Sequence, residues 1–112
     1  MAYDEVLARR LYERLDEPAV TAKKMFGGLA FLTHGNMTVG VHADELIVRL
    51  RPADVAAALE RPGVRQFEVG GRAMRNWVLV SGEMLDEEDL DGWIAEARAY
   101  VDTLPPKRSS GQ

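Results

Sequence analysis

The sequence contains no cysteine, and this absence excludes several kinds of site together. Disulfide bonds, thiolate zinc sites, iron–sulfur clusters and cysteine nucleophiles all require that side chain. A chain without disulfides suits a reducing compartment, so we expect a cytoplasmic protein. We expect no membrane partner and no signal peptide, because no apolar run approaches the length of a membrane span and charged residues begin already at Asp4.

Positive charge is also in the minority. The 112 residues include 14 Lys and Arg but 18 Asp and Glu, which gives a formal net charge of −4 at pH 7. That balance repels a nucleic-acid backbone at long range, and no recognition-helix motif accompanies it. We therefore do not expect direct nucleic-acid binding.

Histidine is scarce too, and neither of the two histidines belongs to a recognisable catalytic or metal motif. His42 has Asp44 and Glu45 nearby, but no second group of ligands with metal spacing accompanies them. Ser81 lacks the Gly-x-Ser-x-Gly frame of a serine nucleophile. The sequence therefore predicts no metal, no cofactor and no catalytic residue, and a protein that is not an enzyme.

What the sequence does contain is a regular succession of apolar patterns. These patterns predict a helix between Asp4 and Pro18, strands at 29–32, 37–41 and 46–50, a helix from Pro52 to Pro62, strands at 67–69 and 74–80, and a helix from Asp86 to Pro105. The class is α+β, with an antiparallel five-stranded sheet covered by helices on one face in the order α-β-β-β-α-β-β-α. We expect one domain over residues 1–106 and a disordered tail over 107–112.

The strand at 37–41 has the alternation of a half-buried strand. Successive side chains of a strand point to opposite faces of the sheet. The pattern therefore predicts Met37, Val39 and Val41 on one face, and Thr38 and Gly40 on the other.

Several motifs lie in order along almost the whole chain, namely Lys24-Met25-Phe26-Gly27-Gly28, Gly35-Asn36-Met37, Pro62-Gly63, Gly71-Arg72 and Leu104-Pro105-Pro106-Lys107. Together they resemble the N-terminal domain of the TfoX/Sxy competence regulators, here as a single domain. The resemblance implies a fold similar to that of the type III secretion chaperones, and a homodimer. It also implies a non-enzymatic protein-interaction module that works as a transcriptional co-regulator through a protein partner such as a transcription factor.

The first candidate site is the loop that holds Lys24, Phe26, Gly27 and Gly28. Glycines allow another backbone or a phosphate to approach closely, and a lysine supplies charge, so this loop could clasp a ligand or a partner. The alternative is purely structural, since paired glycines at the start of a strand usually mark a turn or a bulge. In that interpretation Phe26 belongs to the core.

The second candidate site combines basic and apolar residues on the predicted strands. Arg49 and Arg72, with Lys24, could converge on an anion if their strands are neighbours, and Met74 and Trp77 beside them could form a recognition platform. The alternatives are a solvated sheet face for the cations, and a core or dimer interface for Trp77. Two functions remain open: the interaction module, or a small-anion-binding protein or enzyme with a pocket at the sheet that uses Lys24, Arg49 and Arg72.

Overall fold

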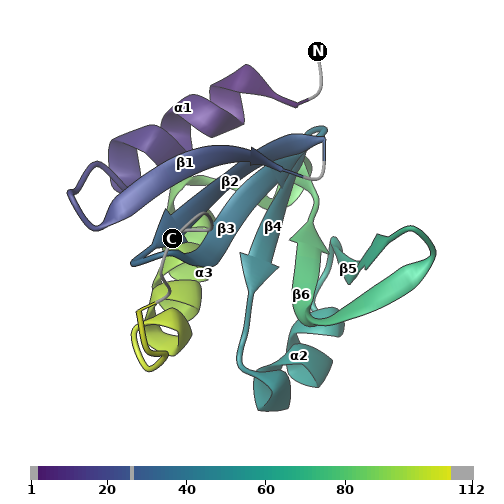
Figure 1. Cartoon of the computed structure of the whole chain (residues 1–112). Coiled ribbons are helices and arrows are strands. Elements are labelled where there is room, and N and C mark those ends of the chain that lie inside the picture. Colours follow the sequence, from purple (N-terminus) through teal and green to yellow (C-terminus); the bar gives the residue numbers. More distant parts are fainter. Residues whose placement is uncertain (1–2, 26, 107–112) are drawn as a thin grey trace.

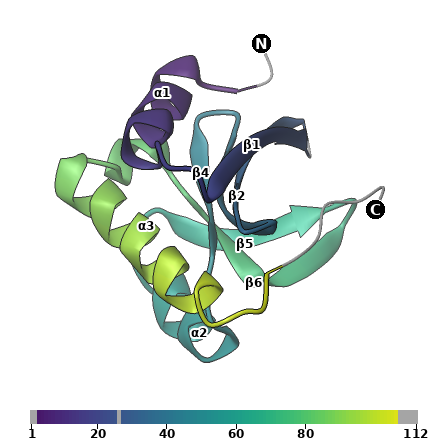
Figure 2. The same cartoon turned by 60° about the vertical axis from the view of Figure 1, so that its left-hand side comes forward.

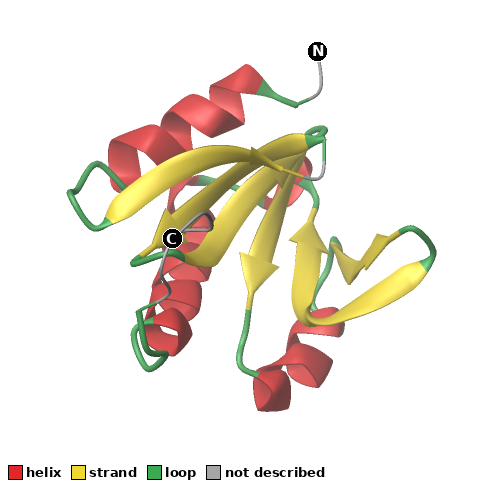
Figure 3. Cartoon of the chain, in the orientation of Figure 1, coloured by secondary structure: helices red, strands yellow, loops and turns green. Residues whose placement is uncertain are grey.

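A six-stranded antiparallel sheet forms the centre of the molecule, and three α-helices lie against it (Figures 1 and 3). The computed structural model describes residues 3–25 and 27–106. The strand order is β1-β2-β3-β4-β6-β5. The elements are α1 (Glu5–Arg14), β1 (Val20–Met25), β2 (Gly28–Thr33), β3 (Asn36–His42), β4 (Glu45–Arg49), α2 (Pro52–Leu59), β5 (Val64–Val69), β6 (Arg72–Val80), a short 3-10 helix η1 (Gly82–Met84) and α3 (Glu87–Val101).

The α+β class and the order of the helices are confirmed, but the sheet has a sixth strand that the sequence pattern did not predict. This strand is β1, which forms one edge of the sheet and pairs only with β2. The four residues at 21–24 are exposed, and only Val20 and Met25 at the two ends are half-buried. A strand that is solvated on both faces has no apolar alternation, so the usual signal for a strand is missing.

Helices α1 and α3 begin directly after residues whose side chains cap them. The side chain of Asp4 accepts hydrogen bonds from the backbone amides of Val6 and Leu7, at 2.8 and 3.1 Å. The side chain of Asp86 accepts one from the amide of Asp89 at 2.8 Å. Both aspartates therefore satisfy amides that a helix leaves without internal partners at its start. None of the helices that the structure describes is long and apolar enough to span a membrane.

The two faces of the sheet are covered differently. On one, the helix face, strand side chains pack with residues of all three α-helices, such as Leu11 of α1, Val55 of α2 and Leu90 of α3. On the opposite one, the second face, the described cluster consists only of strand residues. Its buried members are Ala30, Met37, Ile47, Phe67 and Leu79, and partly buried Met25, Leu32, Met74 and Trp77 pack against them.

A bulge in β3 explains why Met37 belongs to the second face. The register joins Phe31 to Val39 but Leu32 to Met37, so Thr38 is an extra residue in β3. An extra residue reverses the alternation of side chains beyond it. The prediction that Met37 shares a face with Val39 and Val41 is therefore wrong, because alternation alone cannot reveal a bulge.

A second irregularity bends the hairpin of β5 and β6 (Figure 2). The register shifts between Gln66 and Glu68, which takes carbonyl groups of β6 out of the regular ladder. The side-chain amide of Gln66 donates to the carbonyl oxygens of Met74 and Trp77 at 2.8 and 3.1 Å. Gln66 thereby satisfies two carbonyl groups in the irregular part of β6 and fixes the backbone at Met74 and Trp77.

The segment after α3 returns to the sheet. The side-chain amide of Asn36, at the start of β3, donates a hydrogen bond to the carbonyl oxygen of Pro105 at 3.0 Å. Asn36 is a buried polar residue, 8% exposed. The hydrogen bond satisfies its amide and holds the end of the described chain beside the first residues of β3.

Candidate protein-interaction site

Arg49, the last residue of β4, is the centre of the candidate site on the second face. Its guanidinium carbon lies 5.1 Å from the ring centroid of Trp77 and 5.7 Å from that of Tyr100. Trp77 is its direct neighbour on β6, and Tyr100 belongs to the last turn of α3. Both rings are within the range in which an aromatic face attracts a guanidinium, so elements from two parts of the chain hold this cation in place.

The hydrogen-bonding capacity of Arg49 is only partly used. One terminal nitrogen, Nη1, donates a long hydrogen bond of 3.4 Å to the carbonyl oxygen of Met37. The inner nitrogen, Nε, is buried and has no partner among the described residues. No described carboxylate pairs with Arg49. The residue is therefore a positioned, half-buried cation that retains donors for an incoming acceptor.

Partly buried apolar side chains lie on the same face as Arg49. They are Met25, Leu32, Met74 and Trp77. Met74 and Trp77 flank the irregular part of β6 that Gln66 holds. Flexible methionine side chains next to an aromatic ring and a cation are typical of surfaces that bind other proteins.

Lys24 and Arg72 are not brought to this site. Lys24 lies opposite Leu29, whose side chain packs in the helix-face cluster. Directly opposed residues share a face, so Lys24 points to the helix face and Arg49 to the second face. Arg72 pairs with Val69 at the far end of the β5–β6 hairpin. The structure thus groups Arg49, Met74 and Trp77 and separates the other two cations from them, so the geometric basis for an anion pocket built by all three cations is absent.

The paired glycines have structural roles that the register makes plain. Gly27 has φ of +74° in the turn that joins β1 to β2, a conformation that favours glycine. A Cβ atom on Gly28 would overlap with the backbone carbonyl oxygen of Val41 on β3. These observations favour the structural interpretation of the loop. Phe26 lies outside the described residues, as does the predicted tail at 107–112, and whether the loop also binds a partner stays a prediction.

Two of the residues that were considered as metal ligands, His42 and Glu45, have structural partners. Glu45 forms an ion pair with Arg65, and the ring of His42 lies edge-on to Phe67 with centroids 6.3 Å apart. In the described ranges, 3–25 and 27–106, no three His, Asp or Glu side chains are grouped as metal ligands would be.

Ion pairs join α1 to α3 on the helix side of the molecule. Arg14 donates to Glu87 at 2.7 Å and to Asp91 at 2.6 Å, and Arg10 donates to Glu87 at 2.8 Å. Hydrogen bonds from Arg14 and Arg10 hold the pKa of the Glu87 carboxyl below its usual value. The pKa of Arg14 is raised by the same pairing, first by Asp91 and then by Glu87. This cluster fixes the two helices relative to each other.

Some residues of the site were not predicted from the sequence. Tyr100 lies outside the set of residues that α3 buries, which are Leu90, Trp93, Ile94, Ala97 and Val101, so apolar periodicity gave no reason to select it. Ile47 and Leu79 each have an available signal: they lie inside the unbroken apolar runs 46–48 and 77–80. Such runs indicate strands that are buried on both faces rather than one.

An antiparallel sheet with helices on one face, and a cation at the end of β4 within reach of aromatic rings from β6 and α3, define a small α+β domain with a candidate binding surface. The family model of the TfoX N-terminal domain matches residues 11–100, and the chain belongs to that family. The match covers most of the sequence and confirms the resemblance inferred from the motifs. Comparison with curated proteins and with solved structures gave no match.

Proposed function

We propose that the protein is a non-enzymatic interaction module that binds another protein through the second face of its sheet. One observation carries the proposal. Arg49 is positioned by Trp77 and Tyr100, has no carboxylate partner among the described residues, and lies on the same face of the sheet as the partly buried side chain of Met74. A partner that supplies a carboxylate and an apolar side chain would satisfy both features.

Membership of the TfoX N-terminal domain family supports a regulatory role for this binding. We propose that the module acts on transcription through its partner, and that a transcription factor is the partner class to seek first. The net charge of −4 supports action through a protein rather than through direct contact with DNA.

The test is affinity capture from the native lysate after nuclease treatment, with the parent protein and single variants. Met74→Glu places a charge among the apolar side chains, and Arg49→Ala removes the cation. We expect each to lower recovery of a stoichiometric partner by about tenfold. Arg51→Ala is the matched control, since Arg51 is exposed, lies two residues from Arg49 and caps α2 without a side-chain hydrogen bond.

Thermal unfolding of each variant separates loss of binding from loss of folding. If Met74→Glu and Arg49→Ala fold and still recover the partner as the parent does, the second face is not the binding surface. If the parent recovers no protein at all, the module does not work through a stable partner.

We also propose that the protein forms a homodimer. Its molecular mass in solution, measured by sedimentation equilibrium, should be that of two chains. A dimer that Met74→Glu dissociates would use the second face for self-association. A monomer at every concentration would exclude the dimer.

A further inference from the structure

We propose that the open edge of β1 binds an extended acidic segment of another protein, which adds to the sheet as a seventh strand. This inference goes beyond the proposed function because it uses a different edge and a different face of the molecule. It can hold even if variants of the second face bind as the parent does.

The first argument is the direction of the main-chain groups of β1. The backbone amide of His34 donates to the carbonyl oxygen of Ala19 at 2.9 Å, so the carbonyl group of Ala19 points toward β2. The backbone amide of Val20 donates to the backbone carbonyl oxygen of Glu17 at 3.0 Å, so it points away from β2. Along a strand, residues whose backbone amide and carbonyl groups point toward a neighbouring strand alternate with residues whose groups point away from it. The amide and carbonyl groups of Ala22 and Lys24 therefore point away from β2, to the edge where no described strand lies.

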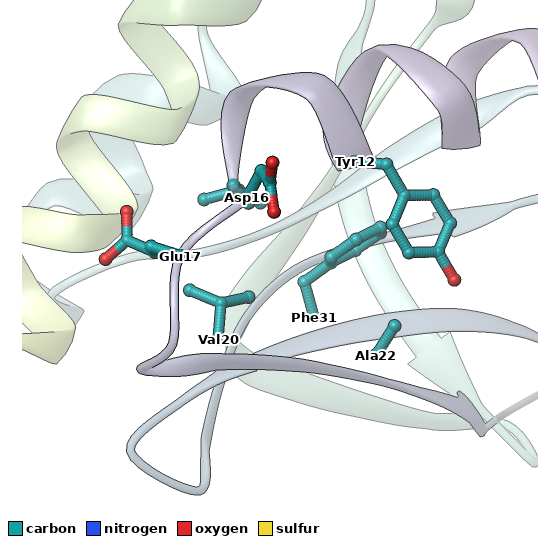
Figure 4. Close-up of a pocket in the computed structure, with 7 residues that line it drawn as sticks. Tyr12, Asp16, Glu17, Val20, Ala22 and Phe31 are labelled. Carbon is teal, nitrogen blue, oxygen red and sulfur yellow. The ribbon is translucent and has the colours of Figure 1, made fainter.

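The second argument is a groove beside this edge, between β1 and α1 (Figure 4). One part has a volume of about 200 Å³, with Phe31 and Ala22 on the sheet and Tyr12 on the helix among its lining residues. The rings of Tyr12 and Phe31 meet edge to face with centroids 5.0 Å apart. A second, separate hollow of about 290 Å³ lies along α1 and shares Tyr12 with the first, with Arg9, Glu5 and Tyr3 also lining it.

The groove is on the side to which every second side chain of an added strand would point. Ala22 lies opposite Phe31, a helix-face residue, so the outward-bonding residues of β1 share the helix face. Ala22 is small and leaves space above the strand. Tyr12 remains 51% exposed despite its ring contact. An apolar side chain opposite Ala22 would cover both.

Two lysines near the β1–β2 turn favour acidic residues opposite that end of the edge, whereas Asp16 and Glu17 line the groove just before β1 begins. Lys23 and Lys24 are exposed, occupy the two faces of β1, and make no ion pair with a described residue. Carboxylates at two successive positions of an added strand would lie opposite them. A second copy of this chain is a poorer occupant, because pairing β1 with another β1 gathers four lysines on one two-stranded ribbon. Lysine on an edge strand is a common device against self-pairing.

An antiparallel segment that meets these conditions has the pattern Glu-Glu-apolar-x-apolar. Its glutamates lie opposite Lys24 and Lys23, and its apolar residues lie opposite Ala22 and Val20. The probe is a fluorescent peptide, Thr-Glu-Glu-Val-Thr-Val-Thr. Control peptides carry lysine in place of both glutamates, or proline in place of the central valine, which removes a ladder hydrogen bond. The readouts are fluorescence anisotropy and the amide NMR spectrum.

We expect saturable binding of the glutamate peptide, with amide shifts at Thr21–Lys24, and at least about tenfold weaker binding of the two control peptides. Lys24→Glu should weaken binding about fivefold or more. Ala22→Pro removes a donor that only the added strand uses, and should weaken it about tenfold. Arg72→Glu, an equal charge reversal at the far end of the β5–β6 hairpin, should leave it unchanged.

Three results would overturn the proposal. No saturable binding of the glutamate peptide, equal binding of the lysine peptide, or full binding by Lys24→Glu would do so. A dimer that Ala22→Pro dissociates, without peptide binding, would place a second copy at the edge instead. If Ala22→Pro fails to fold, Lys24→Glu and the control peptides decide the outcome.

Discussion

The two faces of the sheet are buried by different means. On the helix face, Leu46 and its neighbours pack in one cluster with residues of α1, α2 and α3. On the second face, Ile47 is equally inaccessible, 1% exposed against 0% for Leu46, although its described cluster holds strand residues alone. A curved sheet with bulges can thus bury side chains without a covering layer, and it leaves a partly buried margin where a partner can bind.

The largest expected change in the free energy of unfolding comes from substitutions at two neighbouring residues of β4, one on each face of the sheet. We expect Leu46→Ala to lower the free energy of unfolding by about 3–5 kcal/mol and Ile47→Ala to lower it by about 2–3 kcal/mol, because the thinner cluster relaxes more easily around a cavity. Urea unfolding with an unchanged slope measures both. A change below about 0.5 kcal/mol for Ile47→Ala would mean that the second face is not a packed core.

Gly28 and Gly27 offer a comparison at the turn between β1 and β2. We expect Gly28→Ala to destabilise the protein by about 1–3 kcal/mol, since its Cβ overlaps the backbone of β3. At Gly27 the space is open and only the positive φ opposes a side chain, so Gly27→Ala should cost about 1 kcal/mol. Thermal unfolding of the two variants tests the order. The reverse order would contradict the register of β2 and β3.

Arg49 and Arg61 each lie near aromatic rings, and their substitution compares the contribution of these contacts to stability. Arg49, on the second face, lies near one ring from β6 and one from α3, whereas Arg61 lies 4.0 Å from the ring centroid of Trp93 alone. We expect Arg49→Ala to cost about 1–2 kcal/mol and Arg61→Ala about 0.5–1 kcal/mol, with Arg49→Lys between Arg49→Ala and the parent. Chemical denaturation measures all three. Equal losses at both sites would show that the second ring adds nothing.

The smallest effect concerns the exposed ion pairs of the helix side. Hydrogen bonds of 3.0 and 3.1 Å from Arg98 hold the pKa of Glu17 below its usual value, as Arg14 and Arg10 do for Glu87. A lowered pKa in the folded state contributes stability that is complete above the unfolded-state pKa and is lost as the pH falls through the lowered value. The thermal midpoint should therefore fall between neutral pH and about pH 3.5.

The double variant Glu17→Gln with Glu87→Gln isolates this contribution. It should lower the midpoint at neutral pH slightly and reduce the fall on acidification. A fall as large as that of the parent would assign the acid sensitivity to other carboxylates. High salt should also diminish the difference between the parent and the variant at neutral pH.

The helix face could be predicted from the sequence because its signals are local. Asp4 and Asp86 have side chains that cap helices, and the stripe of α3 repeats at helical spacing. Strand β1 could not be predicted, since its role as an edge comes from pairing with β2 and not from its own apolar content. The face of Met37 depends on one extra residue, which no alternation pattern records.

The candidate site was predictable only in part, for the same reason. Arg49, Met74 and Trp77 could be selected as residues of strands, and the structure groups them. Tyr100 joins them from a distant part of the chain, so no sequence spacing connects it with Arg49. Lys24 and Arg72 were selected for their charge. Lys24 is separated from Arg49 because it lies on the other face of the sheet, and Arg72 because it lies at the far end of a hairpin; both positions depend on the register of the sheet.

The hydrogen bond from Asn36 to Pro105 fixes the point from which the chain continues after Pro106. Asn36 is followed directly by Met37, whose carbonyl oxygen accepts from Arg49. A binding segment fused to this end of the domain would therefore be tethered close to the candidate site, and tethering raises the effective concentration of a segment. A purification tag at that end would compete with an external partner, whereas a tag at the N-terminus would not be tethered beside Arg49.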